Sequence, residues 1–127
     1  MPPPKNMLLL DANVILRYLL ADDASMADKA EEWIGSGLAH ATMEVLAEVV
    51  YVLQKVYGTE RRDIAETVSG VLRQVQCTEN RIAEAALATY AETKLDFVDC
   101  VLCARHRIGG DEIATFDKPL LKYLARP

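Results

Sequence analysis

Cysteine is scarce in this chain, and long apolar runs are absent. The three cysteines are unevenly spaced, which excludes a disulfide framework of the kind that stabilises small secreted domains. No apolar stretch approaches the about 20 residues that are needed to cross a bilayer. The N-terminal Met-Pro-Pro-Pro-Lys lacks the apolar region of a signal peptide. We therefore expect a cytoplasmic protein that does not associate with membranes.

The chain also lacks an excess of positive charge, because it has 14 basic and 19 acidic residues and a net charge of −5. This balance argues against a nucleic-acid partner. However, four of the acidic residues belong to a candidate site described below, and metal binding there would offset their charge. Residues 105–127 carry five basic and three acidic side chains. That segment permits contact with a phosphate backbone.

The composition is that of a globular protein, with 51% hydrophobic and 26% charged residues in 127. A chain of this length buries roughly two-thirds of its unfolded surface. No internal repeat, low-complexity block or linker follows the three prolines. We predict a single domain over residues 1–127, with residues 1–6 flexible.

Short apolar runs alternate with longer amphipathic segments along the chain. This order predicts an α/β fold, a three-layer α/β/α sandwich around a short parallel sheet. In such sheets ligands bind beyond the carboxyl ends of the strands. The predicted strands are 7–10, 38–42, 75–78 and 112–116, and the predicted helices are 14–20, 25–34, 44–57, 61–75, 80–94, 97–108 and 118–124.

Four acidic residues stand in apolar surroundings. Asp11 and Asp117 end apolar runs at predicted strand ends, whereas Glu48 and Asp99 lie within apolar helical segments. Burying one carboxylate costs several kcal/mol unless it is compensated. Four carboxylates converging at one sheet edge would repel each other, so a divalent cation is expected among them. Oxygen ligands without His or Cys favour Mg²⁺ or Mn²⁺, and such a site suits phosphodiester hydrolysis.

Each of these acids also has a purely structural interpretation. Asp11 could favour the N-terminus of a helix, Glu48 could be a surface residue, and Asp117 could cap the last helix. Asp96 is a better N-cap than Asp99, which lies one turn later and faces inward. We therefore assign Asp99 to the metal and Asp96 to a cap or secondary contact.

Four segments, taken in order, resemble the PIN domain, and most closely the VapC toxins of toxin–antitoxin pairs. They are 9–17 with Asp11, 45–53 with Glu48, 96–99 with Asp99, and 114–118 with Asp117. The resemblance covers essentially the whole chain and implies an α/β/α sandwich around a parallel sheet. It also implies an Mg²⁺- or Mn²⁺-dependent endoribonuclease that dimerises and is silenced by a cognate antitoxin.

The resemblance carries the acidic quartet over as catalytic and metal-binding residues. Asp11, Asp99 and Asp117 would hold the metal, with Glu48 binding a second ion or ordering the attacking water. Polar positions that line family sites correspond to Asn13, Thr42 and Thr115. Arg17 and the basic cluster at 105–107 are expected to contact RNA or an antitoxin carboxylate.

Other interpretations remain open at the level of sequence. Cys100 and Cys103, with His106 after them, have the spacing of a metal or redox motif, but they lie in an apolar helical run and are predicted to pack in the core. A signalling receiver domain also binds Mg²⁺ with acids, although it needs paired acids after its first strand, where this chain has only Asp11. A housekeeping PIN nuclease and a catalytically silent PIN scaffold are the remaining alternatives.

Overall fold

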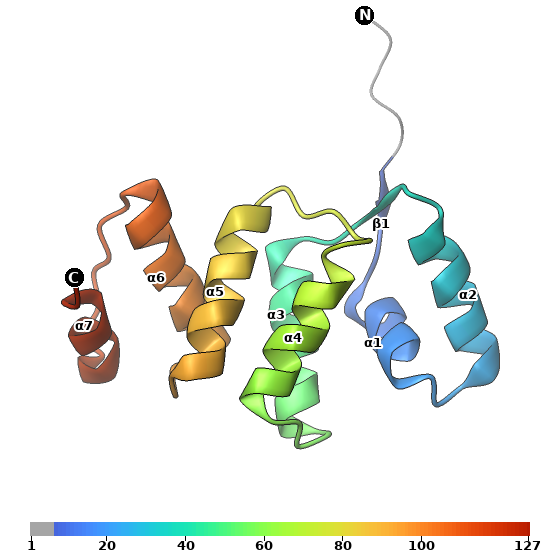
Figure 1. Cartoon of the computed structure of the whole chain (residues 1–127), viewed down its shortest axis with the longest axis horizontal. Helices are drawn as coiled ribbons and strands as arrows, with labels where there is room; N and C mark the ends of the chain where they lie inside the picture. Colours follow the sequence, from blue (N-terminus) through green and yellow to red (C-terminus); the bar gives the residue numbers. More distant parts are fainter. Residues whose placement is uncertain (1–6) are drawn as a thin grey trace, which may run out of the picture.

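The computed structural model describes residues 7–127 of the chain (Figure 1), so the prediction that residues 1–6 are flexible lies outside the described residues. The elements are β1 (Leu8–Leu9), α1 (Ala12–Leu20), α2 (Ala24–Gly35), β2 (Ala39–His40), α3 (Met43–Lys55), α4 (Arg61–Val71), α5 (Asn80–Glu92), α6 (Phe97–Gly109) and α7 (Lys118–Leu124). No helix in this part of the chain is long and apolar enough to cross a membrane.

The sheet is short and parallel. β1 pairs with β2 so that Leu8 lies opposite Ala39 and Leu9 lies opposite His40. Beyond β2, a single parallel bridge joins His40 to Gln76, and the Gln76 N–H donates to the Ala39 carbonyl at 2.9 Å. β1 is therefore an edge strand. The predicted α/β class with a short parallel sheet is confirmed, and the predicted strand at 75–78 is reduced to this bridge.

The predicted strand at 112–116 is wrong. No backbone hydrogen bond connects these residues to other backbone within 7–127, and the Phe116 side chain is completely exposed. Gly110 ends α6 in the left-handed conformation, at φ 74°, and the chain then leads to α7, at the far end of the long axis from β1 (Figure 1). Strand propensity largely reflects packing against neighbouring strands. Without a neighbour, the apolar run stays unpaired.

The helices differ from the prediction mainly at their ends. α2 begins one residue early because Asp23, rather than the predicted Ser25, caps it by accepting the Met26 N–H at 3.0 Å. α4 ends at Val71 instead of residue 75, since the following residues form turns that lead to Gln76. α7 has the predicted bounds.

The core is made mainly by one face of α3, α4, α5 and α6. Leu46 and Val49 of α3 and Ile64 of α4 are fully buried, as are Cys100 and Cys103 of α6. The prediction that these two cysteines pack in the core is confirmed. α5 packs against α4 on one side and α6 on the other.

Candidate active site

Asp11 links the end of β1 to the start of α1. It is the N-cap of α1, with extended backbone, and its carboxylate accepts the Val14 N–H at 3.0 Å. A carboxylate is favourable there because it satisfies a free N–H and lies at the positive end of the helix dipole. The expectation that Asp11 is buried is wrong: the side chain is exposed because no further strand covers this edge of β1. It borders a cavity of about 270 Å³ between α1 and α2.

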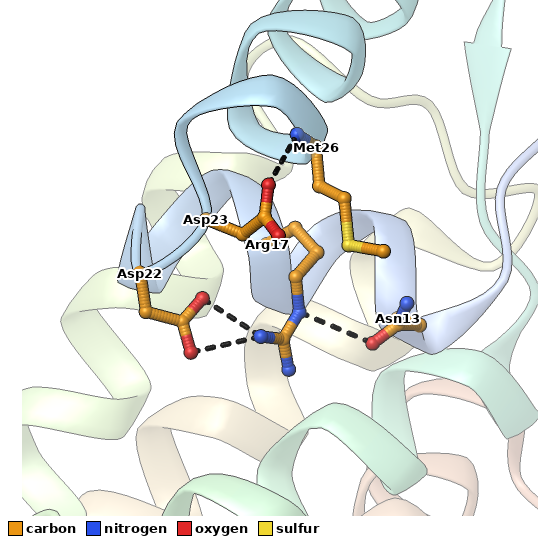
Figure 2. Close-up of polar contacts among 5 residues, drawn as sticks. All are labelled: Asn13, Arg17, Asp22, Asp23 and Met26. Atoms are coloured by element: carbon orange, nitrogen blue, oxygen red, sulfur yellow. Dashed lines mark hydrogen bonds and ion pairs between the residues drawn. The ribbon is translucent and has the colours of Figure 1, made fainter.

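Arg17, further along α1, is held by its own neighbours (Figure 2). One guanidinium nitrogen donates to both carboxylate oxygens of Asp22, at 2.7 and 2.8 Å, and Nε donates to the Asn13 side-chain oxygen at 3.2 Å. This pairing fixes the turn between α1 and α2. An RNA or antitoxin group that used Arg17, as the sequence predicts, would have to compete with Asp22.

The N-termini of α6 and α7 bring three acidic residues near one another. Asp99 lies in the first turn of α6 and is half-buried. Burial, together with the negative charges of Asp117 and Asp96, raises the pKa of the Asp99 carboxyl. Asp117 is the N-cap of α7 and accepts the Leu120 N–H at 3.3 Å, whereas Asp96 makes no side-chain cap bond. The repulsion between Asp99 and Asp117 is what a nearby cation would relieve.

Thr115 and Thr42 are the predicted hydroxyl-bearing positions. Both hydroxyl groups accept hydrogen bonds from backbone N–H groups two or three residues along the chain. The Thr115 hydroxyl accepts the Asp117 N–H at 3.0 Å, which holds the residue that caps α7. Thr42 caps α3 by accepting the Val45 N–H at 3.2 Å. Glu48 is exposed on α3, contrary to the expectation of burial, because the apolar face of α3 is formed by other residues.

The four predicted acids do not meet in one place within one chain. Among residues 7–127, no group of three or more His, Cys, Asp or Glu side chains is close enough to hold a metal ion. The charges that act on Asp99 come from Asp117 and Asp96, whereas Asp11 caps α1, and α1 and α7 lie apart in Figure 1. Carboxylates are the right ligands for a hard cation. Their arrangement in one copy does not complete a metal site, because residues 112–116 do not join the sheet.

The basic cluster at 105–107 is used for internal contacts, which the sequence did not predict. Arg105 forms an ion pair with Glu79, ahead of α5. Arg107 lies 4.3 Å from the Tyr123 ring and donates to the Tyr123 hydroxyl at 3.0 Å. These pairs cannot be read from sequence spacing, because they join residues 16 or more positions apart.

A cavity next to Asp99 was also not predicted from the sequence. It has a volume of about 500 Å³ and lies between α3 and α6. Apolar side chains line it together with Tyr51, Gln54, Lys55 and Asp96. The one sequence signal was Tyr51, an aromatic residue on α3 that proves to be 60% exposed. Such a lining can accept a planar, hydrogen-bonding group beside the Asp99 carboxylate.

Comparison with known proteins gives a family but no individual relative. Searches among curated proteins and among solved structures returned no significant match. The model of the PIN domain matches residues 8–125, a range that contains every acidic residue discussed above. The chain therefore belongs to the PIN domain family, whose fold is in general that of a metal-dependent nuclease.

Proposed function

We propose that this protein is an Mg²⁺- or Mn²⁺-dependent endoribonuclease that hydrolyses phosphodiester bonds in RNA. The observation that carries the proposal is the match to the PIN family over residues 8–125, in a chain whose half-buried Asp99 lies within the electrostatic reach of Asp117. Asp11 and Glu48 are the other acids assigned to the reaction. Each of the four offers oxygen ligands of the kind that hard cations prefer.

The cavity beside Asp99 supports RNA as the substrate. Tyr51 offers an aromatic face, Gln54 an amide and Lys55 a cation, all bordering the same 500 Å³ space. Unpaired bases are commonly bound by aromatic stacking, and phosphates by cations. An exposed base could enter this cavity while its phosphate lies toward Asp99. A double-stranded substrate would not offer a base in this way.

We further propose that the protein acts as the VapC-like toxin of a toxin–antitoxin pair, as a homodimer silenced by a cognate antitoxin. The support is the ordered set of sequence segments around Asp11, Glu48, Asp99 and Asp117. A housekeeping PIN nuclease in RNA processing is the second candidate, since it would use the same acids.

Replacing Asp11 tests the nuclease proposal, and Asp23 provides a matched control. Both residues cap a helix by accepting an N–H at 3.0 Å, but only Asp11 belongs to the acidic set. Asn is as good an N-cap as Asp, so both Asn variants should fold. We expect Asp11→Asn to lower the rate of RNA cleavage in Mn²⁺ by about 100-fold or more. Loss of a residue that only supports a metal ligand already lowers activity by up to about 100-fold.

The same pair of variants separates the alternatives. The Asp23→Asn protein should cleave RNA at a rate within about twofold of the wild-type rate. EDTA should abolish cleavage by the wild type and by the Asp23→Asn protein. If Asp11→Asn cleaves as fast as Asp23→Asn, the assigned site is wrong. If no protein cleaves RNA, the silent scaffold is favoured. For a toxin, expression of the wild type should arrest the growth of a bacterial host and Asp11→Asn should not, whereas a housekeeping enzyme should leave growth unchanged in both cases.

A further inference from the structure

A cavity of about 430 Å³, hereafter the basic cavity, lies between the end of α5 and α7. Three basic side chains line it, Lys94 just after α5, Lys122 on α7 and Arg126 just beyond α7. Among the described residues of the lining, Glu92 is the acidic one. The cavity beside Asp99 has the opposite balance, with two acids and one base. The basic cavity is therefore a local excess of positive charge in a chain whose net charge is −5.

The three cations of the basic cavity are available to a ligand. All of them are exposed, and within residues 7–127 the ion pairs are made by other basic residues of the chain. A concave surface that carries one sign of charge attracts ions of the opposite sign. Cations close to one another also repel each other, and a bound anion relieves this repulsion. The cavity therefore suits a ligand that brings several negative charges.

The walls of the basic cavity are held by contacts within the chain. On the α5 side, Arg61 donates to the Leu95 carbonyl and so fixes the connection that leads into α6. On the α7 side, Arg107 donates to the hydroxyl and to the carbonyl oxygen of Tyr123, at 3.0 and 3.3 Å. The Arg126 guanidinium lies 5.2 Å from the centre of the Tyr123 ring. A ligand therefore has little of this surface to order, which lowers the cost of binding.

The cations of α7 form a row that begins next to the acidic residues. Lys118, Lys122 and Arg126 follow one another at intervals of four residues, a spacing that places side chains on one face of a helix. The row starts directly after Asp117, whose charge acts on Asp99. A small anion would occupy only one part of such a row, whereas a polyanion can follow all of it. The row thus leads from the acidic residues into the basic cavity.

We propose that the basic cavity binds phosphate groups of the RNA strand that flank the cleaved phosphodiester, an inference that rests on the proposed nuclease function for the identity of the strand. The strand passes from Asp99 along α7, and Lys122, Arg126 and Lys94 contact its phosphates. Lysine and arginine contacts to phosphates fix the position of a nucleic acid without reading its sequence. The basic cavity therefore contributes affinity and direction, and any sequence preference depends on other contacts.

Binding of a fluorescent single-stranded oligouridylate, followed by anisotropy in EDTA so that it is not cleaved, tests the cavity itself. The double variant Lys94→Gln/Lys122→Gln should raise the dissociation constant at least about tenfold at about 0.1 M salt. It should also reduce the salt dependence, log Kd against log salt, by about 1.4, because each phosphate contact to a single strand contributes about 0.7.

Arg62→Gln/Arg81→Gln is the matched control for this measurement. It removes the same charge from exposed positions of α4 and α5 that do not line the basic cavity. The control should bind the oligouridylate within about twofold of the wild type and keep its salt dependence. Equal losses of affinity in the two double variants overturn the proposal, because net charge alone then explains them. A wild type that does not bind the oligouridylate overturns it as well.

An acidic protein surface is the alternative occupant, and polyglutamate is the probe for it. If Lys94→Gln/Lys122→Gln weakens the binding of polyglutamate but leaves that of the oligouridylate unchanged, the cavity serves an acidic protein and the proposal is wrong. If the same substitutions weaken binding of the oligouridylate as expected, with its salt dependence, the proposal holds.

Steady-state RNA cleavage in Mn²⁺ separates this inference from the proposed function. Lys94→Gln/Lys122→Gln should raise KM at least about fivefold and change kcat less, because the lost contacts hold the ground state and the transition state alike. A wild type that cleaves RNA, with KM unchanged in this variant, refutes the role of the cavity alone. A wild type that binds RNA through the cavity but does not cleave it refutes the nuclease proposal alone.

Discussion

Tyr90 places a hydroxyl group in the core where, among residues 7–127, it finds no hydrogen-bond partner. The ring itself is well placed: it is 1% exposed, meets Phe97 edge-on at 6.1 Å and lies 3.7 Å from the Arg61 guanidinium. Burial raises the pKa of the phenol, with the Arg61 charge acting in the opposite direction. The Tyr90 ring therefore stabilises the fold, whereas its buried hydroxyl lowers the free energy of unfolding.

Tyr90→Phe should consequently stabilise the protein. Removing an unsatisfied buried hydroxyl recovers about 1 kcal/mol or more of desolvation free energy, while the contacts of the ring stay in place. Chemical denaturation measures the change in the free energy of unfolding. Tyr51→Phe, at a 60% exposed position, should change it by less than about 0.5 kcal/mol. A destabilised Tyr90→Phe would show that the hydroxyl has a partner in solution.

At the scale of elements, α6 depends on a residue that lies 36 positions before it. Arg61 begins α4, and its Nε donates to the Tyr90 carbonyl at 2.8 Å while a second nitrogen donates to the Leu95 carbonyl. These two carbonyls flank the connection between α5 and α6. One guanidinium thus joins α4 to the end of α5 and to the connection that leads into α6, and its planar fork suits two acceptors at once.

Arg61→Met should therefore destabilise the protein strongly. Methionine keeps most of the stem but removes both donors, and hydrogen bonds from a charged group contribute about 1.5–3 kcal/mol. The exposed neighbour Arg62 is the natural comparison, and Arg62→Met should cost less than about 0.5 kcal/mol. Thermal or urea unfolding of the two variants measures the difference. Equal costs would mean that the Arg61 contacts do not hold α6.

Elements of this fold could be predicted from sequence where the signal is local. The period of apolar residues in α3 predicted that helix to within two residues, and the glycine pair at 109–110 predicted the end of α6 to within one. Asp11 and Asp117 were correctly found at element boundaries, because the change from an apolar run to an acid is visible in sequence. The strand predicted at 112–116 was wrong, because a strand forms only when a neighbouring strand pairs with it. The prediction that Asp11 and Glu48 are buried failed for the same reason, because burial depends on which other residues cover a side chain.

The geometry of the candidate site, too, could be predicted only where it depends on residues close in sequence. The nearness of Asp96 and Asp99 follows from one helical turn, and it could be predicted. The nearness of Asp99 and Asp117 depends on α7 returning to α6, which Arg107 and Tyr123 secure through a contact across 16 positions. Sequence reasoning predicted four acids at one sheet edge. Within one chain Asp117 acts on Asp99, whereas Asp11 caps α1, a helix that lies apart from α7 (Figure 1).

At the scale of the whole molecule, acidic residues outnumber basic residues by five, and two of the acidic side chains act on the half-buried Asp99. Its pKa is raised by burial, then by Asp117 and Asp96. An unfolded aspartate titrates near about 3.9. Between that pH and the higher folded pKa, the folded state binds more protons than the unfolded one. The free energy of unfolding must therefore fall as the pH rises through this window.

Asp99→Asn should remove this penalty, provided that EDTA keeps cations away from the carboxylates. At pH 7 the variant should be more stable than the wild type, by up to about 1 kcal/mol for a partly exposed charge. The gain should shrink as the pH falls and vanish below about 3.9, where the wild-type carboxyl is also protonated. Urea unfolding between pH 3 and 8 measures it, with the exposed Asp28 on α2 as control: Asp28→Asn should stay within about 0.5 kcal/mol throughout. A gain that persists unchanged at pH 3 would assign the effect to packing rather than to charge repulsion.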